Sequence, residues 1–191
     1  LNGTLWEQYI AFWSRLLKGD FGPSLLNFPT PVSEIIFNSL PWTCGLLFTT
    51  SVLSWVIGNL LGGISGFFSD RKWAKILSGF ALSVRPFPYA IIALTLIILF
   101  SCLFPIFPLS GGVSIGLRPE LSLTFILDIL YHAFLPALSL VIVGYGGWFV
   151  IMRGMVTYTK TEDYVQFARI AGLPEREIMY RYVLRNSILP Q

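Results

Sequence analysis

The chain has 191 residues, of which 54% are hydrophobic and only 12% are charged, and its formal net charge is +3. An average soluble domain carries roughly 25% charged residues, so this composition excludes a water-soluble globular protein. The small positive charge does not indicate a nucleic-acid partner, because the basic residues flank apolar runs and do not cover a soluble face.

The first 30 residues contain no basic start followed by an apolar core, so they do not indicate a secretory signal peptide. We expect residues 1–38 to be an external segment that precedes a membrane domain at residues 39–191. The chain begins with leucine rather than methionine, and we expect both of its ends to be cuts in a longer protein.

Most of the remaining chain consists of three runs that contain no Asp, Glu, Lys or Arg: residues 35–69, 86–117 and 129–152. Each run exceeds the ~20 residues that an α-helix needs to cross the hydrocarbon core of a bilayer. The sequence therefore predicts an all-α, polytopic helix bundle. We place its transmembrane helices at residues 41–68, 76–104 and 129–152.

The first predicted transmembrane helix contains three glycines at a spacing of four residues: Gly58, Gly62 and Gly66. This spacing places the glycines along one helix face, where the backbone of another helix can approach closely. We expect this face to be a helix-packing surface. The alternative is a glycine-lined pore.

The second predicted helix contains Pro86 and Pro88, which remove two backbone donors and should produce a kink. Arg85 precedes them. The predicted helix is longer than the hydrocarbon core is thick, so we expect Arg85 to lie near the inner membrane interface with its guanidinium reaching toward the headgroups. The alternative is a cavity-lining role.

Basic residues predict the orientation of these helices. Nine of the 13 Lys and Arg residues fall in two short segments on the same side of the membrane. Three follow the first helix and six follow the third: Arg71, Lys72, Lys75, Arg153, Lys160, Arg169, Arg176, Arg181 and Arg185. The positive-inside rule makes this side cytoplasmic, so the segment at residues 105–128 should be external.

Residues 153–188 leave the apolar pattern and predict a helix, a tight turn and a second helix. Thr159 and Glu162 have capping-box spacing for the first helix. Gly172 suits the left-handed position that closes this helix, and Pro174 suits the first position of the next. The first helix carries more apolar side chains than a solvated connector requires, so the loop either docks a partner or simply connects two membrane spans.

The run from Asp163 to Leu173, followed by the run from Arg185 to Pro190, resembles the cytoplasmic loop of bacterial and archaeal ABC importer permeases. The resemblance is to the dipeptide, oligopeptide and nickel branch of these permeases. Of the Glu-Ala-Ala triplet and glycine of the wider family, only Ala168 and Gly172 match here, because Gln166 and Phe167 occupy the first two triplet positions. Shorter matches extend the resemblance over nearly the whole chain.

This resemblance implies the type I ABC importer permease fold, with one helix missing before this chain and two missing after it. It also implies a multi-pass protein of a bacterial or archaeal cell membrane. Its partners would be a second permease subunit, cytoplasmic ATPases, a solute-binding protein and the lipid bilayer, with no nucleic acid. The residues of the loop that would couple to the ATPase are Asp163, Tyr164, Gln166, Phe167, Ala168, Gly172, Leu173 and Pro174.

We expect a transporter subunit rather than an enzyme, because the chain has no glycine-rich phosphate loop; no cofactor or metal is expected. One alternative is an ion-gradient-driven secondary transporter or channel, which needs acidic or histidine relays within its spans. Asp128 and His132 lie near one edge only. Another alternative is a membrane-embedded enzyme, which needs clustered His, Asp, Glu or Cys residues. The substrate stays open among peptides, nickel complexes and oligosaccharides.

Overall fold

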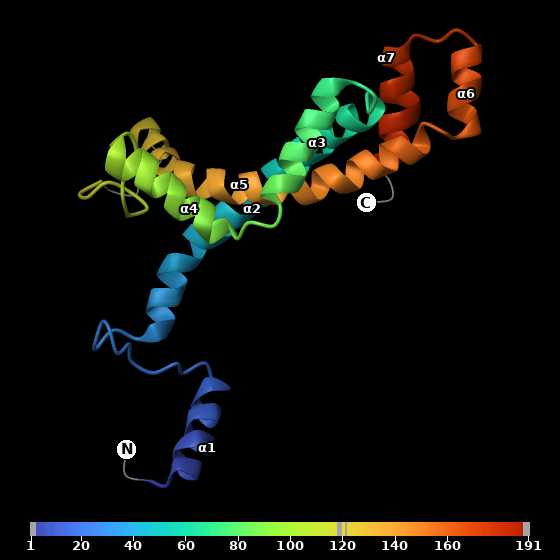
Figure 1. Ribbon diagram of the computed structural model, residues 1–191. Coiled ribbons are helices and arrows are strands. Elements are labelled where there is room, and N and C mark those ends of the chain that lie inside the picture. Colours follow the sequence, from blue (N-terminus) through green and yellow to red (C-terminus); the bar gives the residue numbers. More distant parts are fainter. Residues whose placement is uncertain (1–2, 118–119, 121, 189–191) are drawn as a thin grey trace. The chain divides into compact units, whose positions relative to one another are not determined.

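A computed structural model describes residues 3–117, 120 and 122–188 (Figure 1). Helices dominate these residues, and the described part of the chain has no β-strand beyond one isolated antiparallel bridge between Pro23 and Pro31. The all-α prediction is confirmed. The chain divides into two compact units, Leu1–Gly45 and Leu46–Gln191. Leu189 and Pro190, which end the family-like run, lie outside the described residues.

The first unit begins with α1 (Leu5–Leu16), an amphipathic helix. Thr4 and Glu7 form a capping box at its start, in which each side chain accepts a hydrogen bond from the backbone N–H of the other residue. Trp6 and Tyr9 stack on its surface with ring centroids 5.6 Å apart. Because no residue of α1 is buried, these rings form an exposed aromatic surface.

Within the described residues, two helices are long and apolar enough to cross a membrane: α2 (Val32–Phe67) and α5 (Leu123–Thr159). A third crossing exists if α3 (Lys72–Val84) forms one bent span with α4 (Tyr89–Ile97) and the π-helix η1 (Ile98–Leu103). α3 and α4 both pack along α5 (Figure 1). The predicted bundle of about three transmembrane segments is therefore present as two unbroken helices and one bent pair.

The second predicted transmembrane helix is broken rather than kinked, which corrects the prediction of one helix at residues 76–104. α3 and α4 are bent by 97°. Pro86 has no N–H, Phe87 donates to the Val84 carbonyl at 3.1 Å, and Pro88 becomes the N-cap of α4. Two prolines one residue apart remove two donors from the same helical turn, which explains why the helix ends here.

Both unbroken helices are longer than predicted. α2 begins at Val32 instead of residue 41, contains Pro41 within it and passes through the predicted domain boundary after residue 38. α5 continues beyond Met152 to Thr159. Its 37 residues, at about 1.5 Å each, span about 55 Å and exceed the hydrocarbon thickness of about 30 Å. The uncharged run at residues 129–152 covers only the central part of α5, so it did not mark the ends of this helix.

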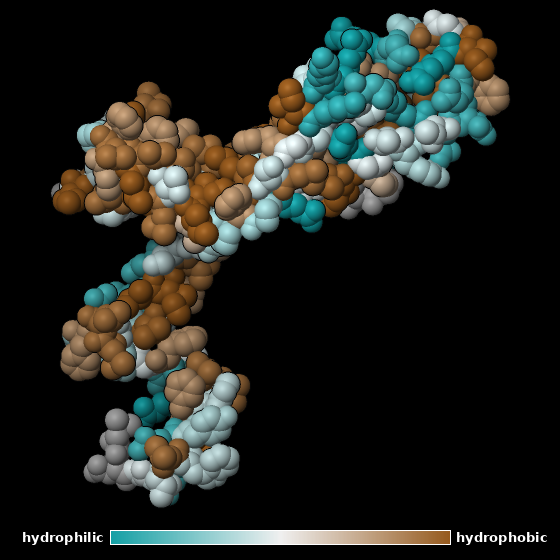
Figure 2. Space-filling view, in the orientation of Figure 1, coloured by the Kyte–Doolittle hydropathy of each residue, from teal (hydrophilic) through white to brown (hydrophobic). Residues whose placement is uncertain are grey.

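After α5 the chain forms a terminal hairpin, residues 160–188. Its first arm is α6 (Asp163–Ile170); its second arm is the continuous run of α7 (Glu175–Glu177), η2 (Ile178–Leu184) and α8 (Arg185–Ile188). The two arms lie side by side in Figure 1. Figure 2 shows hydrophilic residues gathered at this end of the second unit, whereas α4 and the adjoining part of α5 are hydrophobic. The predicted helix-turn-helix is confirmed.

Candidate functional site

The glycine row of α2 lies directly against α5. A β-carbon built on Gly58 would lie 2.7 Å from the Tyr145 carbonyl oxygen, and one on Gly66 would lie 2.9 Å from the Arg153 carbonyl oxygen. At Gly62 it would overlap the backbone of Phe149. Only glycine allows the two backbones to come this close. We call this contact the glycine seam.

Buried hydroxyls join α2 to α3 beside the glycine seam. The Ser65 Oγ donates to the Ala74 carbonyl at 3.1 Å, and the Ser78 Oγ donates to the same carbonyl at 2.6 Å. Both serines are buried. Because buried hydroxyls need partners, these bonds satisfy both side chains, and the Ser65 bond joins α2 to α3.

An apolar core joins the terminal hairpin to the ends of α2 and α5. Its buried members come from α2, α5, α6 and η2: Phe67, Met152, Val156, Val165, Ala168, Ile178, Met179 and Val183. Burial of each large aliphatic side chain contributes about 1.5–3 kcal/mol. The hairpin is therefore seated on the membrane helices by packing rather than held by a flexible tether.

Two polar contacts reinforce this seat. The Lys160 Nζ donates to the carbonyl of Phe67, the last residue of α2, at 2.6 Å and lies 5.6 Å from the centroid of the Phe67 ring. A cation at the carboxyl end of a helix complements the helix dipole. Ser187 Oγ lies 3.0 Å from Thr159 Oγ1, and both residues are buried. These contacts fix the start and the end of the hairpin.

Residues of the predicted coupling set divide between two faces of α6. Ala168 faces inward and is only 5% exposed, next to fully buried Val165. Leu173, just after the helix, is partly buried and packs on the same core. Ala168 and Leu173 are therefore placed to hold the hairpin together, and direct contact with a partner would have to come from the other face.

The other face of α6 presents aromatic and aliphatic side chains to the surroundings. Phe167 is 69% exposed and Ile170 is 81% exposed, with Tyr164 exposed beside them. Asp163 and Gln166 are also exposed, and the Gln166 Nε2 donates to the Lys160 carbonyl at 3.1 Å. We call Tyr164, Phe167 and Ile170 the outer face. Ile170 was not among the predicted coupling residues, although its spacing of three from Phe167 places it on the same side of the helix.

Gly172 closes α6 in the left-handed conformation, with φ at +79°. Its N–H donates to the Arg169 carbonyl at 3.0 Å, and the N–H of Leu173 donates to the Ala168 carbonyl at 3.2 Å. This pair of bonds is the Schellman motif. Arg169 and Glu175 form an ion pair across the turn, with the Arg169 Nε 3.3 Å from the Glu175 Oε1.

Two details of the predicted hairpin are wrong. Thr159 is the last residue of α5 and not a cap, because its hydroxyl is used in the buried contact with Ser187. The N-cap of α6 is Glu162, which makes no side-chain capping bond. Pro174 is the N-cap of α7 rather than its first residue. Glu177 and Arg181 form the expected pair, 2.8 Å apart.

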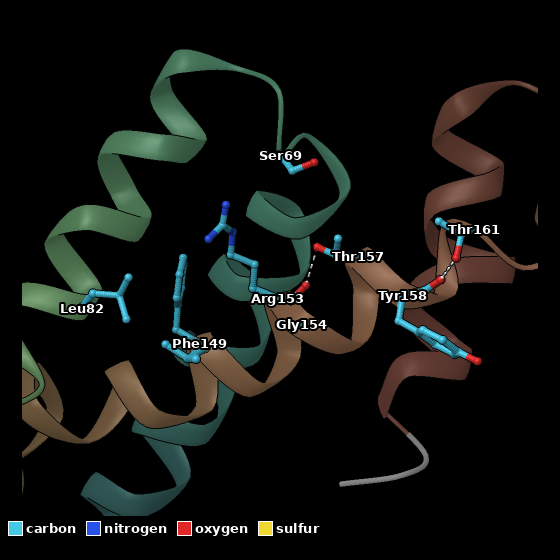
Figure 3. Close-up of a pocket in the computed structure, with 9 residues that line it drawn as sticks. Ser69, Leu82, Phe149, Arg153, Gly154, Thr157, Tyr158 and Thr161 are labelled. Atoms are coloured by element: carbon cyan, nitrogen blue, oxygen red, sulfur yellow. Dashed lines mark hydrogen bonds between the residues drawn. The ribbon is translucent and has the colours of Figure 1, made fainter.

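A crevice lies beside the seat of the hairpin, between the ends of α2, α3 and α5 (Figure 3). Its volume is about 650 Å³. Its lining includes Ser69, Leu82, Phe149, Arg153 and Thr157. In Figure 3 the side chain of Arg153 extends from α5 between Leu82 of α3 and Ser69 at the end of α2. Arg153 was predicted only as one of the basic residues that follow the third transmembrane helix.

Asp128 and His132, the candidates for an ion relay, lie in the opposite half of α5. The Asp128 carboxylate accepts bonds from the Ser114 backbone N–H and hydroxyl at 2.7 and 2.6 Å. The His132 Nδ1 lies 2.9 Å from the Asp128 carbonyl. These contacts close the 104–117 loop onto α5. Among the described residues, no group of three His, Cys, Asp or Glu residues is placed to hold a metal ion.

Over residues 58–191 the chain matches the family described as "Binding-protein-dependent transport system inner membrane component". It is 31% identical to the oligopeptide transport system permease protein AppB of Bacillus subtilis, across the whole of this chain and 58% of that relative. It is 27% identical to OppB of Salmonella typhimurium, another oligopeptide transport system permease protein, with the same coverage. The inner membrane ABC transporter permease protein YejB of Escherichia coli O157:H7 is 27% identical over 96% of this chain and 50% of its own length. The chain thus spans 58% or less of these relatives.

Proposed function

This chain belongs to the family of binding-protein-dependent transport system inner membrane components, and from that membership we propose that it is a permease subunit of an ATP-driven importer. Its membrane helices would form part of the path of the solute. The terminal hairpin would dock a cytoplasmic ATPase. Peptides are the proposed solutes, because relatives carry the name of oligopeptide transport permeases. A second permease subunit and a solute-binding protein would complete the transporter in a bacterial or archaeal cell membrane.

The outer face of α6 is the observation that carries this proposal. Phe167 and Ile170 are largely exposed on a helix whose other face is sealed in an apolar core. Exposed aromatic side chains on a rigid support are typical anchors of protein interfaces. The predicted coupling residues fit this role in two ways: Tyr164, Phe167, Asp163 and Gln166 would contact the ATPase, while Ala168, Gly172, Leu173 and Pro174 would hold the helix and turn in shape.

The seat of the hairpin suggests how force would pass from the ATPase to the membrane. Lys160 ties the hairpin to the end of α2, and Ser187 ties it to the end of α5. A displacement of α6 would therefore move both helices, because packed elements shift as bodies rather than deform. ATP-dependent closure of the partner would in this way bias the bundle between inward-open and outward-open states.

Docking is tested by paired substitutions on the hairpin of the full-length permease in its complete transporter. Phe167→Ser should reduce both the amount of co-purified ATPase and the rate of solute uptake in proteoliposomes by about fivefold or more, because an exposed aromatic anchor is lost. Tyr180→Ser is the matched control, since Tyr180 is a comparably exposed aromatic residue on the other arm of the hairpin. Wild-type uptake and ATPase recovery in Phe167→Ser would rule out the outer face as the docking surface.

Orientation needs a separate experiment in intact cells. Cys44 and Cys102 are exposed and free, so both are first replaced by serine. Single cysteines are then placed at Ile115, which is fully exposed, and at Arg176 on the hairpin. An impermeant thiol reagent should label position 115 and leave position 176 unlabelled until the membrane is opened. Labelling of position 176 alone in intact cells would reverse the proposed topology.

A further inference from the structure

The crevice beside the hairpin has the chemistry of a lipid site. We propose that it binds an anionic phospholipid, with the phosphate on Arg153 and the upper part of an acyl chain on the apolar wall formed by Leu82 and Val150. This inference requires the helices to lie in a membrane and does not depend on import or on ATPase docking.

Arg153 supplies a positively charged group that has an unpaired hydrogen-bond donor. Its Nε is buried and has no hydrogen-bond partner among the described residues. No Asp or Glu is among the described residues that line the crevice, and Asp70, which follows the lining residue Ser69, is exposed. A buried donor without an acceptor is unfavourable, and a charged donor forms its strongest bonds with phosphate or carboxylate oxygens. A phosphate oxygen would satisfy this Nε.

Of the hydroxyls of Thr157, Thr161 and Ser69 in the crevice, two already donate their hydrogen to a backbone carbonyl. Thr157 already donates to the Arg153 carbonyl at 2.8 Å, and Thr161 donates to the Tyr158 carbonyl at 2.7 Å. The Ser69 Oγ lies 3.5 Å from the Lys160 Nζ, where it can only accept. Its own hydrogen is therefore available to a ligand oxygen. Arg153 and Ser69 thus each offer a donor in a crevice whose lining is largely apolar, which suits an amphiphile better than a free ion.

The position of Arg153 along α5 agrees with a lipid headgroup. It is the first charged residue after the uncharged run at residues 129–152, so it lies where the hydrocarbon core ends and lipid phosphates begin. Basic pockets between transmembrane helices on the cytoplasmic side are known to bind anionic headgroups. Gly154 keeps the crevice open, since nothing lies within 4 Å of the position its β-carbon would take.

The test measures lipid retained by the full-length protein purified in detergent. Native mass spectrometry should detect bound phosphatidylglycerol in preference to phosphatidylcholine. Arg153→Gln should weaken phosphatidylglycerol binding by about tenfold or more, because one charge-assisted contact is lost. Lys72→Gln removes an exposed charge at the start of α3, outside the crevice, and should leave binding unchanged.

A second variant fills the crevice while keeping the charge. Gly154→Leu places a side chain in open space on a helix and should abolish phosphatidylglycerol binding without loss of folded protein. Equal binding by wild type, Arg153→Gln and Gly154→Leu would overturn the proposal, as would equal retention of the two lipids by the wild type. Displacement of phosphatidylglycerol by millimolar inorganic phosphate would show a simple anion site and would also overturn it.

Discussion

In the glycine seam, a β-carbon added at Gly62 would overlap the backbone of Phe149, yet the backbone of Gly62 is ordinary helix. In the turn between α6 and α7, nothing lies within 4 Å of a β-carbon added at Gly172, yet its φ is +79°. Lack of space restricts which residues can replace Gly62 in the seam, whereas the left-handed backbone conformation restricts which residues can replace Gly172 in the turn. Two glycines that look alike in the sequence should therefore respond differently to the same substitutions.

The largest effect is expected in the seam. Gly62→Leu should lower the stability of the full-length protein by about 3 kcal/mol or more, because the added side chain meets a backbone that cannot move independently of α5. Thermal unfolding and the yield of detergent-purified protein measure this loss. Gly79→Leu is the control on an exposed helix position with open space. Equal stability of the two variants would mean that α2 and α5 are not in close contact.

A smaller effect is expected in the turn. Gly172→Ala should cost about 1–2 kcal/mol, because a residue with a β-carbon disfavours the left-handed conformation. Gly172→Asn should cost less than Gly172→Ala, since asparagine tolerates this conformation better. Gly172→Asp should lower transport while the membrane helices stay inserted. If Gly172→Ala and Gly172→Asn lower the unfolding temperature equally, the left-handed backbone conformation does not determine which residues this position tolerates.

Gly63 sharpens the distinction between a backbone neighbour and a side-chain neighbour. A β-carbon there would lie 2.6 Å from the terminal methyl carbon Cδ2 of Leu184 and 3.3 Å from the Met152 Cε. These atoms are the ends of flexible side chains and can shift. Gly63→Ala should therefore cost less than about 1 kcal/mol, below the cost of Gly62→Ala in the same unfolding assay. A larger loss at Gly63 than at Gly62 would contradict the assignment of the seam.

The smallest effect is expected at a glycine that has open space around its β-carbon position and an ordinary helical backbone conformation. Gly79 lies in α3 with an ordinary helical φ and no atom near its β-carbon position. Gly79→Ala should raise stability by about 0.5–1 kcal/mol, because alanine loses less conformational freedom in a helix. The unfolding temperature of the variant should rise slightly. A fall would mean that this face of α3 contacts another part of the full-length protein.

Local sequence was sufficient for much of the hairpin. Gly172 was predicted to be left-handed from a glycine followed two residues later by proline, and its φ agrees. The Glu177–Arg181 pair was predicted from its spacing and is present. These features depend on residues within a few positions of one another, so the chain's own backbone chemistry determines them.

Features that depend on distant residues were predicted less well. Thr159 has the correct spacing for a capping box, but its hydroxyl meets Ser187 from the other end of the hairpin. α6 has apolar residues on both faces, so its sequence alone did not show that Ala168 would face the core and Phe167 the exterior. The prolines at positions 86 and 88 predicted a distortion, whereas its size of 97° reflects how α3 and α4 each pack on α5.

The residues of the apolar core beneath the hairpin are synthesised in a definite order. Phe67, Met152 and Val156, which form its base, all precede the hairpin residues Val165 and Val183 in the chain. A ribosome adds about 5–20 residues each second, so the base residues emerge before the hairpin residues do. Each apolar side chain of the hairpin can then pack on the base as soon as it has been synthesised. Assembly of this end of the protein can follow the direction of synthesis, without a long interval in which its inner face stands open to water.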